Sequence, residues 1–558
     1  MVLATSAELT TPPIAPARRR LPAGRLAVGL AALGIGYRLV LLLAEVPPTN
    51  SDEAVTGLVA RHVVQGNEFP LFFYGQYYMG ALESYLAAPL FAAFDSSILA
   101  LRLPNLLLYA AFLALMWQLT RRLYTPWLAA ATVGLLALGS DRILKNQLIA
   151  GGGYPEMNPA GALLVLLAVN LGLGVVRRRA LAYAGFGLVA GLTLWDDWLV
   201  LPYVAAAGVL LLGIGWRDLP GRRGLALLAG LLAGLVPIGW HNLTTAPENR
   251  SLAIYDVLNG EVLTSWYDRL SGGILFGVPM GTGLCPPERC ASWQLWWGLA
   301  YPVLLVAAAL LAAWALCRAT GRPERVRQAG RLTLLTGAGL TLFGYVSSSA
   351  AALTPVESAR YLSCLLISTP ALLWPLWSMV TRRPVPGRPP VPGGSGAPAR
   401  TPVAGRPGGG RLLRLAGAVP LTALVATMAL ASGSLIGASP ALAREAAQRR
   451  DLVDGLDRLG VRRFYAEYWT CNNVIFLTRE RLVCGVIRDD LQAGWDRYPA
   501  YPELVAEAPR PAFVLPAGTA LNTAVRNHLR GTGVAVTETT VAGYDVYQTA
   551  APVDLPLR

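Results

Sequence analysis

Long apolar runs alternate with short polar segments over most of the chain. A helix needs about 20 mostly apolar residues to cross about 30 Å of hydrocarbon, and by this measure the sequence predicts an α-helical polytopic membrane protein with about 11 transmembrane helices. The two predicted spans between 181 and 215 are short and are separated by Trp195-Asp196-Asp197-Trp198, which predicts a tight turn. The predicted spans are 26–44, 99–119, 126–140, 158–175, 181–194, 198–215, 224–240, 297–317, 331–350, 361–380 and 415–437.

Arginine clusters between the apolar runs indicate the orientation. Cytoplasmic loops of membrane proteins carry an excess of Lys and Arg. The clusters of this chain all fall on one side of the predicted spans, together with the N-terminus. We therefore expect a multi-pass protein of the plasma membrane, with a cytoplasmic N-terminus and an external C-terminus. The clusters are Arg121-Arg122, Arg177 to Arg179, Arg217 with Arg222-Arg223, Arg322 to Arg331, and Arg382 to Arg414.

The composition supports a membrane protein and argues against a nucleic-acid-binding one. Hydrophobic residues make up 54% of the chain and charged residues only 14%, whereas soluble domains usually carry about 25% charged residues. The net charge of +14 would suit nucleic acid. However, the sequence has no basic face interleaved with aromatic residues, so we do not expect nucleic-acid binding.

Changes in composition along the chain predict five segments. These are a basic cytoplasmic tail (1–25), a transmembrane core (26–380), a linker (381–414), a last span (415–437) and an external domain (438–558). The linker is rich in Pro, Gly and Arg and cannot bury a core, so we expect it to be disordered. After 438, strand-like runs alternate with helical patterns, which predicts a small, tethered α/β domain.

Four cysteines fall on the expected external side. Cys285 and Cys290 flank Pro-Pro-Glu-Arg in one loop, and Cys471 and Cys484 lie in the C-terminal domain. Two local disulfides suit an oxidising compartment. Four unpaired thiols are the alternative.

The first external loop, 45–98, carries the densest pattern of polar and aromatic residues. Apolar residues recur at helical spacing from 53 to 66, which predicts an amphipathic helix lying on the membrane surface. Asp52 lies at the start of this helix, where a carboxylate suits both a helix cap and the helix dipole. The aromatic segment 69–80 suits the membrane interface or stacking against a sugar. A second interfacial helix would carry Glu83.

Four motifs follow one another through this loop and into the second span, namely Asp52-Glu53, Ala60-Arg61-His62 with Gly66, Glu83, and Arg102-Leu103-Pro104. Their order and spacing resemble those of the polytopic membrane glycosyltransferases of the C superfamily. This superfamily includes the protein O-mannosyltransferases (glycosyltransferase family 39) and the lipid A aminoarabinose transferase.

The resemblance implies an inverting transfer of a sugar from a polyprenyl-phosphate-linked donor to a glycan, lipid or protein acceptor at the outer face of the membrane. It also implies that Asp52 is the catalytic base. The chain departs from the aminoarabinose branch directly after Glu83, where Ser84-Tyr85 stands in place of a Lys-Pro-Pro. A phosphate contact made by that lysine is therefore not expected here.

The residues of the first loop also suit this chemistry when they are considered independently of the resemblance. An acceptor hydroxyl must lose a proton as it attacks the anomeric carbon, and a carboxylate within about 3 Å can take that proton. The leaving lipid phosphate is already a stable anion, so an arginine or a metal that holds it is sufficient. The sequence requires no cofactor and leaves the use of a divalent metal open.

Six further residues are predicted to bind substrate, and five of them have an alternative. Glu53 could instead be a structural or orienting partner, and Glu83 could position the acceptor, bind a metal or face solvent. Tyr154 and Glu156 follow a glycine run and could belong to an ordinary loop. Arg360 matches phosphate geometry but could also anchor a span at the interface. The six predicted residues are Glu53, Arg61, Glu83, Tyr154, Glu156 and Arg360.

Two other functions compete with glycosyl transfer. A flippase for lipid-linked sugars predicts ionisable or helix-breaking residues at mid-span in two corresponding halves, and the sequence lacks this symmetry. A non-catalytic scaffold would leave the acidic and aromatic residues of the first loop unexplained. The expected partners are the polyprenyl-phosphate donor, the acceptor and membrane lipids.

Overall fold

The structure, a computed structural model, describes residues 22–286, 290–381 and 409–555. Within these residues, eight helices are long and apolar enough to cross a membrane. A ninth crossing is formed if α5 (Pro126–Ala137) and α6 (Asp141–Leu148), which meet at 93°, count as one bent span. The predicted helical polytopic fold is confirmed. The predicted N-terminal tail and linker lie almost entirely outside the described residues.

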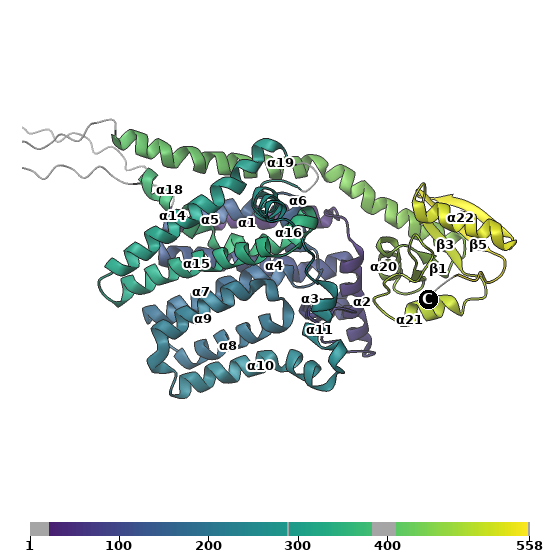
Figure 1. Cartoon of the computed structure of the whole chain (residues 1–558), viewed down its shortest axis with the longest axis horizontal. Helices are drawn as coiled ribbons and strands as arrows, with labels where there is room; N and C mark the ends of the chain where they lie inside the picture. The colour runs from purple at the N-terminus through teal and green to yellow at the C-terminus, as the bar shows by residue number, and fades with distance from the viewer. Residues whose placement is uncertain (1–21, 287–289, 382–408, 556–558) are drawn as a thin grey trace, which may run out of the picture.

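The helices form an elongated bundle with the C-terminal domain at one end (Figure 1). The remaining long helices of the bundle are α1 (Ala23–Leu43), α4 (Ile98–Leu123), α7 (Tyr154–Leu173), α8 (Arg179–Asp196), α9 (Leu201–Gly215), α10 (Arg222–Thr244), α14 (Trp296–Arg318), α15 (Arg322–Ser347), η7 (Ala359–Ser368) with α18 (Thr369–Thr381), and α19 (Gly409–Arg458). Shorter helices connect them: α2 (Ser51–Gln65), α3 (Leu82–Phe94), η1 (Trp198–Val200), η2 (Trp216–Asp218), η3 (Pro247–Asn249), α11 (Ser251–Leu258), α12 (Trp266–Leu270), η4 (Ser271–Gly277), α13 (Val278–Gly281), η6 (Ser292–Leu295), α16 (Ala350–Leu353) and α17 (Pro355–Ser358).

The count of about eleven spans was too high by this measure of length and apolarity. The predicted spans 181–194 and 331–350 lie in α8 and α15, which are not among the eight. Helix α8 has only 18 residues and begins and ends with a charged residue. Helix α15 begins with an arginine-rich segment, carries several Gly and Thr residues, and buries residues along most of its length. A helix packed inside a bundle needs small residues for close contact more than it needs an apolar surface.

The arginine-rich segments come together at the end of the bundle away from the C-terminal domain. Arg322, at the start of α15, donates hydrogen bonds to the carbonyl oxygens of Gly172 at the end of α7 and Ile214 at the end of α9, both at 3.3 Å. Arg331 donates to the carbonyl oxygen of Leu123, at the end of α4, at 2.8 Å. These contacts place the start of α15 beside the ends of α4, α7 and α9.

From its amphipathic pattern we expected helix α2 to lie on the membrane surface. It is instead covered by other parts of the protein. It packs against α3 and against α20 (Tyr468–Leu477) of the C-terminal domain, and most of its residues are buried. The second contact is tight, because a Cβ atom on Gly57 would lie 2.4 Å from the ring of Phe476. The C-terminal domain covers the face that the sequence assigned to solvent.

The C-terminal domain has the mixed α/β fold that the sequence predicted. Its five-stranded sheet has the order β2-β1-β3-β5-β4. Strand β1 is parallel to β2 and β3, and β5 is antiparallel to β3 and β4. The strands are β1 (Arg463–Ala466), β2 (Val483–Val486), β3 (Ala512–Pro516), β4 (Val536–Val541) and β5 (Tyr544–Thr549), and the domain also contains α21 (Ala500–Ala506) and α22 (Ala520–Thr532).

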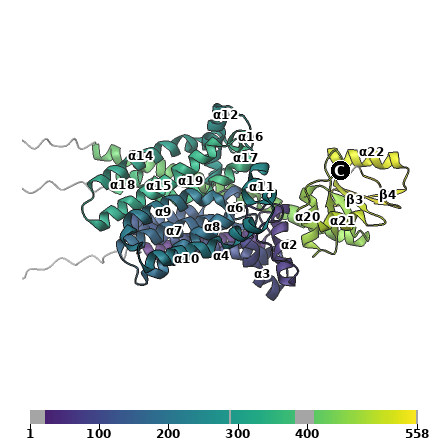
Figure 2. The same ribbon diagram turned by 60° about the horizontal axis from the view of Figure 1, so that its bottom comes forward.

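Two features fix this domain to the bundle. Helix α19, 50 residues long, continues past the predicted end of the last span and leads into β1 (Figure 1), and the turned view shows α20 and α21 beside α2 at that end of the bundle (Figure 2). In addition, one hydrophobic core contains residues of α2, α3 and the start of α4 together with the core of the sheet domain. The domain is therefore packed onto the first loop rather than merely tethered.

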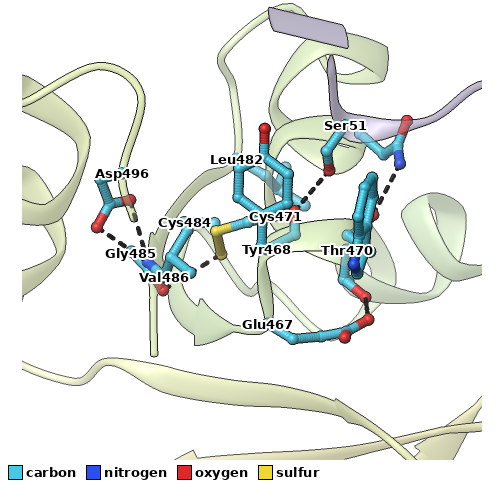
Figure 3. The surroundings of a disulfide bond; sticks show 12 residues. Ser51, Glu467, Tyr468, Thr470, Cys471, Leu482, Cys484, Gly485, Val486 and Asp496 are labelled. Carbon is cyan, nitrogen blue, oxygen red and sulfur yellow. Dashed lines mark hydrogen bonds between the residues drawn. A yellow bond between two sulfur atoms is a disulfide. The ribbon is translucent and has the colours of Figure 1, made fainter. Parts of the chain in front are cut away.

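Both predicted disulfides are present. Cys285 is bonded to Cys290 and Cys471 to Cys484. The second bond joins α20 to β2 directly beneath the contact between α20 and the start of α2 (Figure 3). It therefore stabilises the part of the domain that faces the first loop.

Candidate functional site

Asp52 lies in the first turn of α2 but does not cap the helix. The cap is Asn50, whose side-chain oxygen accepts a hydrogen bond from the backbone N–H of Glu53 at 2.9 Å. The Asp52 carboxylate is therefore free of the helix backbone and remains 25% exposed. Its Oδ1 accepts a hydrogen bond from the hydroxyl of Tyr468 at 2.5 Å and lies 3.5 Å from Nη2 of Arg497.

Glu53 points the other way, into the bundle. Arg102 of α4 donates hydrogen bonds to both of its carboxylate oxygens, at 2.7 and 2.6 Å, and neither side chain is exposed. Arg102 also donates to the carbonyl oxygen of Pro47 at 2.7 Å. This arrangement gives Glu53 the orienting role that the sequence left open, because it fixes α2 to the start of α4.

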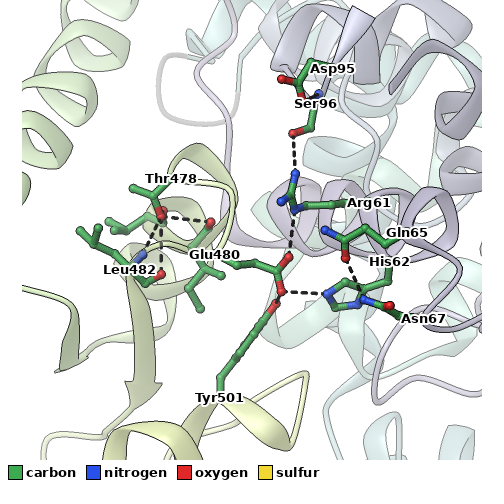
Figure 4. Close-up of polar contacts among 12 residues, drawn as sticks. Arg61, His62, Gln65, Asn67, Asp95, Ser96, Thr478, Glu480, Leu482 and Tyr501 are labelled. Carbon is green, nitrogen blue, oxygen red and sulfur yellow. Dashed lines mark hydrogen bonds and ion pairs between the residues drawn. The ribbon is translucent and has the colours of Figure 1, made fainter. Parts of the chain in front are cut away.

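Arg61 and His62 face the C-terminal domain. Arg61 donates to Glu480 at 2.9 Å, and the Nε2 atom of His62 lies 3.0 Å from the other oxygen of Glu480 (Figure 4). The hydroxyl of Tyr501 also donates to Glu480, at 3.0 Å. Burial raises the pKa of Glu480, but the hydrogen bonds from His62 and Arg61 outweigh this effect and bring the pKa to about 2. His62, which falls on the polar side of the predicted amphipathic helix, is buried.

Glu83 anchors the glycine run that precedes α7. Its buried carboxylate accepts hydrogen bonds from the backbone N–H groups of Gly151 and Gly152, at 3.3 and 2.8 Å. Gly152 and Gly153 have φ values of 101° and 88°, a backbone conformation that glycine adopts readily, so the run makes a tight turn. Burial raises the pKa of Glu83 to about 7, although the backbone hydrogen bonds oppose this change.

Two further carboxylates lie near Glu83. Glu156, near the start of α7, and Asp196, at the end of α8, interact with Glu83 electrostatically. Both are buried, and among the described residues neither oxygen of Glu156 has a hydrogen-bond partner. No three Asp, Glu, His or Cys side chains in the described ranges are placed to hold a metal ion. The free oxygens of Glu156 can accept hydrogen bonds from hydroxyl groups.

A pair of arginines faces the same region. Arg360, at the start of η7, lies with its guanidinium carbon 5.4 Å from the ring centre of Tyr154, and it interacts electrostatically with Asp52. Arg142 of α6 lies near Arg360, so the two cations repel each other. The Nε atom of each is buried and has no partner among the described residues. Two such groups favour an anionic ligand between them.

The structure thus divides the predicted site residues into three groups. Asp52, Tyr154 and Arg360 lie within electrostatic range of one another. Glu83 and Glu156 lie together in a buried group of carboxylates. Glu53 and Arg61 instead hold α2 in place, toward the bundle and toward the C-terminal domain. Sequence reasoning missed three residues as site members: Arg142, Tyr468 and Arg497.

Comparison with solved structures relates the fold to known proteins. The chain is similar to ArnT from Cupriavidus metallidurans in the apo state, with a TM-score of 0.53 and 14% identity, over 94% of this chain and 98% of that chain. The same protein bound to undecaprenyl phosphate gives a TM-score of 0.53 and 13% identity over the same shares of each chain. The chain therefore has the fold of ArnT over nearly its whole length, as the resemblance implied.

The fold is also similar, to a lesser degree, to a second solved protein. The archaeal oligosaccharyltransferase AglB from Archaeoglobus fulgidus, in complex with an inhibitory peptide and a dolichol-phosphate, gives a TM-score of 0.42 and 12% identity, over 96% of this chain and 75% of that chain. No protein-family profile matches the sequence, and no curated protein sequence matches it.

Proposed function

We propose that this protein is a membrane glycosyltransferase. It moves a sugar from a polyprenyl-phosphate-linked donor to an acceptor at the outer face of the membrane and inverts the anomeric carbon. The observation that carries the proposal is the position of Asp52. This partly exposed carboxylate lies within electrostatic range of Arg360, in a fold similar over nearly its full length to ArnT, one structure of which is bound to undecaprenyl phosphate.

In the proposed step, Asp52 is the general base. The acceptor hydroxyl oxygen bonds to the anomeric carbon, and the hydroxyl proton passes to the Asp52 carboxylate. The bond from the anomeric carbon to the donor phosphate oxygen breaks, and the phosphate keeps the electron pair. A positioned base typically accelerates such a reaction by about 10²- to 10⁴-fold.

Arg142 and Arg360 are proposed to hold the donor phosphate. Their repulsion and their partnerless Nε atoms would both be relieved by a phosphate group between them, since guanidinium matches phosphate geometry. The charge that develops on the leaving phosphate would then be stabilised without movement of the protein.

The sugar is proposed to contact Tyr154 and Glu156 directly. Glu83 is proposed to act on the sugar site through the turn that it holds. The partnerless oxygens of Glu156 can accept hydrogen bonds from sugar hydroxyls. Glu83 fixes the turn from which Tyr154 and Glu156 project. Glu53 and Arg61 act on the site indirectly, because each anchors the helix that carries Asp52.

The proposal is tested by supplying a panel of radiolabelled polyprenyl-phosphate sugars to the purified protein in sealed proteoliposomes. Label that appears on an acceptor, with release of polyprenyl phosphate, supports glycosyl transfer. Label that crosses the bilayer with its donor chemically unchanged would instead support a flippase, and would overturn the proposal.

A further inference from the structure

We infer that the C-terminal domain completes the active site, with Tyr468 and Arg497 as positioning residues for the Asp52 carboxylate. The inference rests on the proposed function, because it assigns a role in the step that Asp52 performs. It adds two residues that lie more than 400 positions along the chain from the base, as the separation of 416 between Asp52 and Tyr468 shows.

The three side chains form a connected hydrogen-bonding group. Arg497 donates from Nε to the hydroxyl of Tyr468 at 2.9 Å, and that hydroxyl donates in turn to Oδ1 of Asp52 at 2.5 Å. The Nη2 atom of Arg497 lies 3.5 Å from the same oxygen. Because the Tyr468 oxygen accepts from Arg497, its own proton is directed to Asp52.

Only one oxygen of Asp52 is used in this way. Among the described residues, no side chain or backbone group donates a hydrogen bond to Oδ2 of Asp52. A carboxylate held through one oxygen presents the other in a fixed direction. An acceptor hydroxyl can therefore meet Oδ2 without displacing Tyr468, which is the geometry that a general base requires.

Arg497 is itself held firmly, although it lies between the two parts of the protein. Its side chain is only 7% exposed. The guanidinium carbon lies 4.2 Å from the ring centre of Trp495 and 5.0 Å from that of Phe73 in the first loop. A cation packed between two rings has few alternative orientations, so the position of Arg497 is set before substrate binds.

Tyr468 is fixed by its backbone as well as its hydroxyl. Its carbonyl oxygen accepts a hydrogen bond from the hydroxyl of Ser51, at 2.5 Å, on the residue directly before Asp52 (Figure 3). The disulfide between Cys471 and Cys484 holds the first turn of α20, from which Tyr468 projects. The start of α20 and the start of α2 are therefore joined by two separate hydrogen bonds.

The test compares two variants that each remove one phenol hydroxyl from the contact between the domain and the first loop. Tyr468→Phe removes the donor to Asp52, whereas Tyr498→Phe removes a donor to Glu68, at 2.7 Å, in the same contact. We expect Tyr468→Phe to lower kcat for sugar transfer by about 10- to 100-fold with KM changed less than about 3-fold, since hydrogen bonds to charged groups have this weight. Tyr498→Phe should retain wild-type kcat.

Arg497 provides a second test through conservative replacement. Arg497→Gln should lower kcat to a similar extent, and Arg497→Lys should restore part of the loss because it returns the positive charge. Equal losses for Tyr468→Phe and Tyr498→Phe, with no rescue by Arg497→Lys, would mean that these residues only hold the domain, and would overturn the inference.

The outcomes separate this inference from the proposed function. If the wild-type protein transfers sugar and Tyr468→Phe transfers it at the same kcat, the positioning role is overturned while the function stands. If the wild-type protein transfers no sugar from any donor of the panel, the proposed function fails and the positioning role fails with it. Thermal unfolding of the Tyr468→Phe, Asp52→Asn and double variants shows separately whether the two residues are coupled.

Discussion

Arg102 donates one hydrogen bond to each carboxylate oxygen of Glu53, at 2.7 and 2.6 Å, in a site that excludes solvent from both side chains. Because of this ion pair, the adjacent carboxylates of Asp52 and Glu53 have different environments. Glu53 points into the bundle and fixes α2, while Asp52 points to the C-terminal domain and keeps one oxygen available. The placement of the proposed base thus depends on a neighbour that takes no part in the chemistry.

Removing one partner of this pair should destabilise the fold strongly. Glu53→Gln or Arg102→Met leaves an uncompensated or poorly paired buried group, which typically costs about 3–5 kcal/mol. The measurement is the free energy of unfolding in detergent. The matched control is Arg327→Met, which removes a half-exposed pair with Glu324 and should change stability by less than about 1 kcal/mol. Equal effects would contradict the structural role of Glu53.

The glycine run before α7 offers a comparison between two neighbouring positions. Gly152 has a φ of 101°, and a Cβ atom there would lie 1.8 Å from Met79. Gly152→Ala should therefore cost about 1–2 kcal/mol of stability and lower transfer, because Tyr154 and Glu156 follow this turn. Gly151→Ala should be tolerated, since the nearest atom to its Cβ lies 3.7 Å away. A Gly152→Ala variant with wild-type stability and activity would contradict this account of the turn.

The contact centred on Glu480 should weaken in acid. The pKa of Glu480 falls from 4.5 to about 2 in the folded protein, so the folded state binds fewer protons than the unfolded state between these values. The stabilisation is present above about pH 5 and is lost as the pH falls toward 2. The difference between the unfolding midpoints of the wild type and Glu480→Gln should therefore shrink steadily as the pH falls from about 5 toward about 2. A difference that stays constant over this range would refute the assignment.

The two arginines proposed to hold phosphate should determine donor affinity. Arg360→Gln and Arg142→Gln should each weaken inhibition by polyprenyl phosphate by about 10- to 100-fold, because each loses a charge-assisted hydrogen bond. The control is Arg318→Gln, at the far end of α14, where the side chain packs on Trp314. Wild-type inhibition in both the Arg142 and Arg360 variants would exclude this phosphate site.

Local sequence pattern was sufficient for the elements of the fold. Apolar runs located the helices, and the placement of Cys471 and Cys484 on the expected external side suggested a bond that the structure contains. These features depend on residues that are near one another in the chain. The predicted count of spans differs at α8, which is short and has charged residues at both ends, and at α15, which contains Arg, Gly and Thr residues among its apolar ones.

Contacts between distant segments could not be predicted in the same way. His62 looked like a surface residue because nothing in its neighbourhood indicates that Glu480, 418 positions later, covers it. The runs that contain Tyr468 and Arg497 combine aromatic and charged residues, and from the sequence such runs suit the core of a small domain slightly better than a carbohydrate site. Their role became visible only when the C-terminal domain was seen against α2.

The most direct test of the proposed function is sugar transfer in proteoliposomes by Asp52→Asn beside Asp95→Asn. Asp95 lies in the same loop, but its side chain is half exposed and pairs with Arg479. We predict that Asp52→Asn loses at least about 100-fold in kcat, as expected for removal of a general base, while Asp95→Asn transfers sugar as the wild type does. Full transfer by folded Asp52→Asn would contradict the account.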